Sequence, residues 1–62
     1  MWHLNEYVGR RVINIKTNKH GKISGLENCE ENIVFIITYT DKTTEQLPAD
    51  PELLPEYHLK FL

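Results

Sequence analysis

Three histidines and one cysteine are the residues of this 62-residue chain that most often bind metals or act as nucleophiles: His3, His20, Cys29 and His58. A protein zinc site usually takes two ligands from one short segment, as in a Cys-x-x-Cys or His-x-x-x-His pair. No two of these four residues stand that close together. The spacing therefore predicts no metal site, and no other motif predicts a cofactor.

Cys29 also lacks the sequence neighbours of a catalytic thiol. It precedes Glu30, whose negative charge disfavours the thiolate that a nucleophilic cysteine needs. Glu30 and Glu31 are adjacent in a polar loop and face different ways, so they do not form an acid–base pair. The three glycines do not have the spacing of a phosphate-binding loop. We therefore expect a protein that is not an enzyme.

Positive charge is concentrated in one segment of the chain. Five of the seven Lys and Arg residues lie between Arg10 and Lys22, whereas eight of the nine carboxylates follow from Glu27 onward, and the formal net charge is −2. A basic segment can bind the phosphate backbone of a nucleic acid, although the same pattern also fits a solvated surface. The candidate residues for this alternative function are Arg10, Arg11, Lys16, Lys19, His20 and Lys22.

Length and composition limit the class of protein. Sixty-two residues predict a single domain over residues 1–62, with a core that supplies on the order of 3–5 kcal/mol. A single cysteine excludes an intrachain disulfide and suits a reducing compartment. No apolar run approaches the roughly 20 residues of a membrane span, and the N-terminus does not resemble a signal peptide. We expect a cytoplasmic protein; Met1 favours a whole product or an N-terminal piece, and a truncation after Leu62 stays open.

Five segments have the pattern of short strands: 11–16, 22–27, 33–39, 44–47 and 56–61. The segment 33–39 is the clearest, because its residues are β-branched or aromatic throughout. Three prolines between Pro48 and Pro55 exclude a central strand there, and they predict a loop with one 3₁₀ turn at 51–54. The fold predicted is all-β, a small five-stranded SH3-like (Tudor-type) barrel with a short helical turn before the last strand. Closure of that barrel would remove exposed sheet edges.

Both faces of the segment 33–39 are apolar. Ile33, Phe35, Ile37 and Tyr39 alternate with Val34 and Ile36. Only one face of a barrel strand points inward. The other face must be covered by the N-terminal segment (Trp2, Leu4) or by the C-terminal strand, or it must contact a partner or a second copy of the chain. The candidate partner-binding residues are Trp2, Val34, Ile36 and Thr38, with Trp2 included because tryptophan often dominates such surfaces.

Four spaced motifs together resemble a known family. They are Tyr7-x-Gly9-x-x-Val12, His20-Gly21-x-Ile23-x-Gly25-x-Glu27, an apolar strand that ends in Tyr39, and Leu47-Pro48-x-Asp50. This pattern resembles the RNA-polymerase-interacting domain of CarD-type transcription regulators and of transcription-repair coupling factor. It is also similar to the Tudor-like domain at the C-terminus of some superfamily-one helicases.

The resemblance covers residues 7–61, with two departures. Lys22 stands where the family has a second turn glycine, and Leu47 replaces the usual valine before Pro48. The helical DNA-binding domain of CarD-type regulators is absent from the 62 residues. The resemblance implies a bacterial, non-catalytic interaction module whose partner is a protein of the transcription or DNA-repair machinery, such as RNA polymerase. A homodimer, a structural role and an inhibitor that mimics a surface remain open alternatives.

Overall fold

The structure, a computed structural model, describes residues 4–62. Five strands and two 3₁₀ turns follow one another in the order η1 (Leu4–Tyr7), β1 (Arg11–Asn14), β2 (Lys19–Cys29), β3 (Asn32–Tyr39), β4 (Thr44–Pro48), η2 (Leu54–Tyr57) and β5 (Leu59–Phe61). Both helical turns contain four residues, and no helix in this range has the length and hydropathy needed to cross a membrane.

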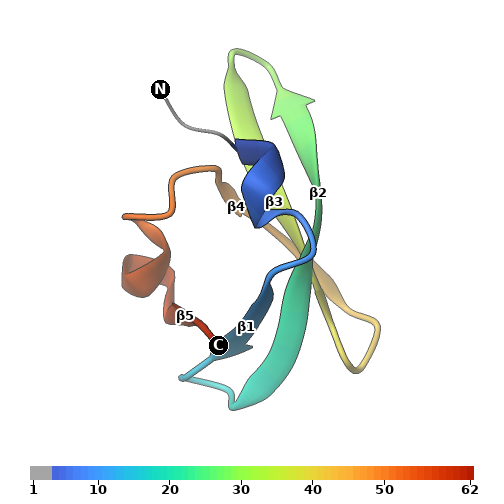
Figure 1. The fold of residues 1–62 in the computed structure, drawn as a ribbon, viewed down its shortest axis with the longest axis vertical. Helices are drawn as coiled ribbons and strands as arrows, with labels where there is room; N and C mark the ends of the chain where they lie inside the picture. Colours follow the sequence, from blue (N-terminus) through green and yellow to red (C-terminus); the bar gives the residue numbers. More distant parts are fainter. Residues whose placement is uncertain (1–3) are drawn as a thin grey trace.

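The strands form one antiparallel sheet in the order β4-β3-β2-β1-β5, which curls into a half-barrel (Figure 1). The core fills the concave side of this sheet. Its buried side chains come from all five strands and from η2, and they are Val12, Ile23, Phe35, Ile37, Tyr39, Leu47, Leu54 and Leu59. The prediction of an all-β fold with a helical turn before the last strand is therefore confirmed.

The sheet does not close into a full barrel. Within residues 4–62, β4 pairs only with β3 and β5 pairs only with β1, so these two strands are the edges of the sheet. The segment 49–58, which contains η2, crosses from one edge to the other (Figure 1). β5 has only three residues, and Pro48 has no N–H group to donate. Short edge strands and an edge proline protect an open sheet from edge-to-edge pairing, as closure would.

The 3₁₀ turn lies at Leu54–Tyr57, so its predicted position at 51–54 is wrong by one turn. Pro55 occupies the first turn of η2, where its fixed φ and missing N–H cost nothing. His58 ends the turn in the left-handed conformation (φ 67°), and its N–H donates to the carbonyl oxygens of Leu54 and Pro55. The last strand therefore starts at Leu59 and is shorter than predicted.

The turn between β1 and β2 also differs from the prediction. The side-chain oxygen of Asn14 accepts hydrogen bonds from the N–H groups of Lys16 (3.0 Å) and Thr17 (3.1 Å), which ends β1 at Asn14. Asn18 takes the left-handed conformation of the turn (φ 59°). A glycine often supplies this conformation in a turn, but Gly21 lies inside β2. Gly25 lies at an irregularity of the sheet, because the β2–β3 register shifts between Ile23 and Gly25.

Candidate binding surfaces

The outer, convex face of β3 carries the three predicted partner-binding residues that the structure describes. Val34, Ile36 and Thr38 alternate with the buried core residues of the strand, and each is half-buried. Leu4 and Phe61, from the two segments expected to cover this face, pack instead against the core. Trp2, the fourth predicted residue, lies outside the described residues.

Polar side chains of β2 and β4 flank the two apolar residues of this face. The side-chain nitrogen of Gln46 donates to Glu27 Oε2 at 3.0 Å, and this bond joins β4 to β2 across β3. Thr38 Oγ1 donates to Ser24 Oγ (2.9 Å), which in turn donates to the carbonyl oxygen of Ile36 (3.1 Å). These contacts explain why the apolar side chains of the outer face are only half exposed.

One end of this face opens into an apolar hollow of about 490 Å³. Its lining residues are Asn32, Ile33, Val34, Pro48, Ala49, Asp50 and Leu53. Two large apolar side chains here are exposed to water, Ile33 by 44% and Leu53 by 36%. We define the apolar patch as Ile33, Val34, Pro48, Ala49 and Leu53. Alternation along the strand placed Ile33 on the same face as the buried Phe35 and Ile37. The sequence did not indicate that Ile33, near the start of β3, is exposed.

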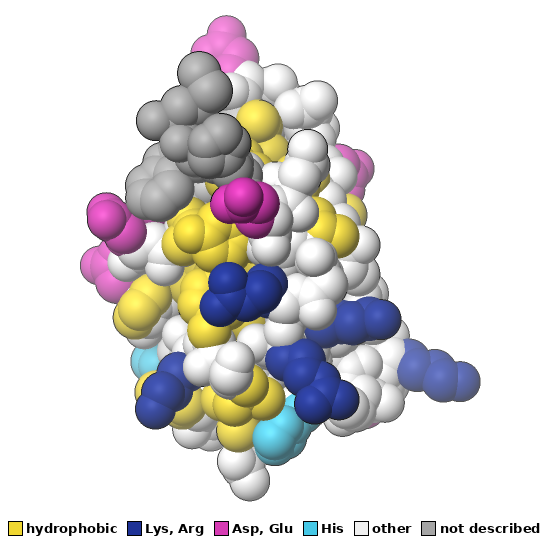
Figure 2. Space-filling model, in the orientation of Figure 1, with side chains coloured by type: hydrophobic (Ala, Val, Ile, Leu, Met, Phe, Trp, Pro, Cys, Tyr) yellow, Lys and Arg dark blue, Asp and Glu magenta, His cyan; other side chains and the backbone are white. Residues whose placement is uncertain are grey.

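The second surface is basic and lies on the outer face of β5, β1 and β2. Val12 and Ile23 are fully buried, so Arg11 and Lys22 point outward from neighbouring strands, where the register places them directly opposite each other. In the next row Ile13 lies between His20 on β2 and Lys60 on β5. We define the basic face as Arg11, His20, Lys22 and Lys60. In Figure 2, Lys, Arg and His side chains gather on the lower half of the molecule, and most acidic side chains lie on the upper half.

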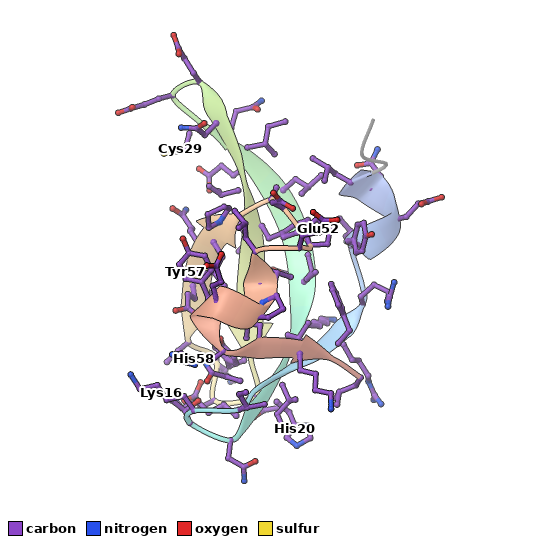
Figure 3. All side chains as sticks on the ribbon, turned by 90° about the vertical axis from the view of Figure 1, so that its left-hand side faces the viewer. Lys16, His20, Cys29, Glu52, Tyr57 and His58 are labelled. Atoms are coloured by element: carbon purple, nitrogen blue, oxygen red, sulfur yellow. The ribbon has the colours of Figure 1, made fainter. Side chains whose placement is uncertain are left out.

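The other three residues of the predicted basic set lie elsewhere. Lys19 Nζ forms an ion pair with Asp41 Oδ2 at 2.8 Å. The guanidinium carbon of Arg10 lies 4.7 Å from the ring centre of Phe61, at the distance of a cation–π contact. Lys16 lies in the turn after β1, on a different side of the lower end from His20 (Figure 3). The structure therefore brings together half of the predicted set and adds Lys60, which the sequence did not indicate.

Potential catalytic and metal-binding side chains are dispersed. Within residues 4–62, no three His, Cys, Asp or Glu side chains are placed so that they could hold one metal ion. The exposed Cys29 lies near the tip of the β2–β3 hairpin, whereas His20 and His58 lie in the lower half of the molecule (Figure 3). No pair of these three residues forms a nucleophile–base arrangement.

Among residues 4–62, two titratable groups have shifted pKa values, and both stabilise the fold. Burial raises the pKa of Tyr39, whose hydroxyl accepts from Asn14 (3.4 Å) and donates to Glu45 Oε1 (2.7 Å), the second bond raising the pKa further. The hydrogen bond from Lys19 lowers the pKa of Asp41, and bonds from the side chain and backbone of Thr43 lower it further. Asp41 thereby holds the β3–β4 turn to the start of β2.

Comparison of the chain with protein-family models, with curated proteins and with solved structures finds no match. The function must therefore be argued from the molecule's own surfaces. In the described range, the apolar patch lies at one end of the sheet and the basic face at the other.

Proposed function

We propose that this chain is a non-catalytic interaction module that binds another protein through the apolar patch and the adjoining outer face of β3. The observation that carries the proposal is the exposure of Ile33 and Leu53 in one hollow with Val34 and Pro48. Such a concentration of exposed apolar side chains is costly in a small domain, and it often marks a protein interface. A fully desolvated apolar pocket is also where interface residues contribute most to affinity.

The SH3-like (Tudor-type) assignment of the fold is part of this proposal. The strand order β4-β3-β2-β1-β5 and the 3₁₀ turn before β5 support it. So do the sequence motifs that resemble the polymerase-interacting domain of CarD-type regulators. On that resemblance, the partner is a protein of the transcription or DNA-repair machinery.

The surroundings of the patch indicate the chemistry of the partner. Asp50 lines the hollow, and Glu27 lies directly opposite Val34 on β2. A partner that fits this surface inserts an apolar side chain into the hollow and places Lys or Arg side chains at its rim. Electrostatic complementarity of this kind gives specificity and speeds association more than it adds affinity.

Site-specific photocrosslinking tests the proposal in cells of the organism whose genome encodes the chain. A photoreactive phenylalanine derivative replaces Leu53 in the hollow or, as the control, the exposed Thr17 in the β1–β2 turn. The proposal predicts one discrete crosslinked protein with the Leu53 replacement and not with the Thr17 replacement. Identical products from both positions, or a product that is only a second copy of this chain, would contradict it.

A further inference from the structure

The closest neighbours on the basic face carry charges of the same sign. Arg11 and Lys22 occupy opposite positions of the β1–β2 register, and directly opposite like charges destabilise a sheet. The ion pair recorded among residues 4–62 joins Lys19 to Asp41, not either of these two residues. The pair therefore gives a local excess of positive charge that an anion can neutralise.

The same two side chains border a hollow of about 240 Å³ on the sheet. Its lining is completed by Gly21 and by the segment Thr38, Tyr39 and Thr40. Thr40 is exposed and brings a hydroxyl donor to the edge of the hollow. Arg11, Lys22 and Thr40 supply a guanidinium, an ammonium and a hydroxyl group to this part of the sheet, and such donors bind phosphate oxygens well.

Two further groups extend the positive charge beyond this hollow. His20 and Lys60 flank Ile13 in the neighbouring row, so charge spans from β5 to β2 over about 10 Å, two strand spacings. His20 adds a ring N–H donor to this surface. A surface of this width suits a run of phosphates rather than a single small anion.

The aromatic residues of the sheet lie on the other side. Phe35 and Tyr39 are buried in the core, and Phe61 packs against it together with Tyr7. Single-strand binders use aromatic side chains as platforms on which bases stack. The basic face, as far as the structure describes it, has no aromatic side chain on which a base could stack. Its contacts therefore suit the phosphate backbone of a duplex, whose bases are already stacked and paired with one another.

We propose that Arg11 and Lys22, assisted by His20 and Lys60, bind the phosphate backbone of duplex nucleic acid without reading its sequence. The basic face shares no residue with the apolar patch, although Thr38 of the outer face of β3 also lines the hollow beside Arg11 and Lys22. This proposal does not depend on the proposed function. A chain that uses both surfaces holds its protein partner next to a duplex.

Fluorescence anisotropy with a labelled duplex of about 20 base pairs tests the proposal, starting at about 50 mM salt where screening is mild. The variant is Arg11→Gln/Lys22→Gln. The control, Lys16→Gln/Lys42→Gln, removes the same charge from exposed turn residues. We expect the variant to bind roughly tenfold more weakly. The slope of the logarithm of the binding constant against the logarithm of the salt concentration should be smaller in magnitude by about 1.8, because two phosphate contacts are lost. We expect the control to keep the slope of the original chain. Thermal unfolding verifies that each variant is folded, and Lys22→Gln/Lys60→Gln replaces the first variant if needed.

Four results would overturn the proposal. They are the absence of binding at about 50 mM salt, an equal loss of affinity in the control, tighter binding of a single strand than of the duplex, and competition by polyglutamate as effective as competition by unlabelled duplex. The last result would show that the basic face binds acidic protein segments instead.

Discussion

The backbone of Gly21 lies against the ring of Tyr39, with no room for a side chain between them. A Cβ atom at position 21 would come within 2.9 Å of Tyr39 Cδ1 and within 2.8 Å of the carbonyl oxygen of Thr38. Gly21 therefore allows β2 and β3 to pack closely at the end of the core, and Tyr39 fills the space that a side chain would otherwise take.

Gly21→Ala is expected to lower the free energy of unfolding by about 1–3 kcal/mol, because overpacking forces the ring or the strand to move. Gly25→Ala is the matched control, since a Cβ atom there meets nothing within 4 Å. We expect the control to change stability by no more than about 0.5 kcal/mol. Urea denaturation of both variants measures this, and equal losses would show that the close packing at Gly21 is not what matters.

Tyr39→Phe is expected to cost about 1–2 kcal/mol near neutral pH, because it removes the hydroxyl that donates to Glu45. The cost should shrink in alkali. The pKa of Tyr39 is raised from 10.0 in the folded chain, so the unfolded state loses its phenol proton first as the pH rises. The stabilisation from Tyr39 is therefore complete below about pH 10 and is lost above it. Denaturation of both proteins between about pH 8 and pH 11 tests this, and a constant difference would contradict it.

Asp41→Asn should lower stability at neutral pH and have less effect in acid. The lowered pKa of Asp41 means that its stabilisation is present above the ordinary value of 3.8 and is lost as the pH falls toward the folded value. Both side chains of the Lys19–Asp41 pair are exposed, so the effect should be small and should decrease in salt. Denaturation midpoints at pH 7 and in acid provide the measurement. A difference that persists unchanged in acid would rule out the ion pair as its cause.

Leu54→Ala is expected to cost about 2–5 kcal/mol, since Leu54 is fully buried in the core. Leu53→Ala, at the preceding and partly exposed position, should cost much less. The comparison tests whether η2 begins at Leu54 and directs that side chain inward. Circular dichroism melts measure both variants, and a larger loss for Leu53→Ala would contradict the inward direction of Leu54.

Much of the fold could be predicted because the signals are local. The β-branched run in β3 and the prolines before β5 each specify the conformation of their own segment. The position of η2 was missed because Pro51 and Pro55 both fit the start of a helical turn. The choice depends on which leucine reaches the core, and that is a property of the tertiary structure.

The surfaces were less predictable because they combine strands that are distant in sequence. Lys60 joins Arg11 through the pairing of β1 with β5, and nothing in either segment indicates that pairing. Leu53 and Val34 line one hollow because the loop after β4 passes the start of β3, where the N–H of Ala49 donates to the carbonyl oxygen of Ile33 (3.1 Å). Alternation did identify the outward direction of Val34, Ile36 and Thr38, which needed only the period of one strand.

The measurement that tests the central claim most directly is a pull-down from a lysate of the cell that encodes the chain, with Val34→Glu beside the unchanged chain. Thr17→Glu is the control, because it adds the same charge at an exposed turn. Leu53→Glu is a second variant in the hollow, at a more exposed site, in case Val34→Glu does not fold. Circular dichroism verifies that each protein is folded.

We predict that the unchanged chain and Thr17→Glu retain the same protein and that Val34→Glu and Leu53→Glu lose it. Mass spectrometry would then identify that protein, which we expect to belong to the transcription or DNA-repair machinery. Retention of the same protein by the folded Val34→Glu and Leu53→Glu variants would contradict the claim that the apolar patch is the binding surface.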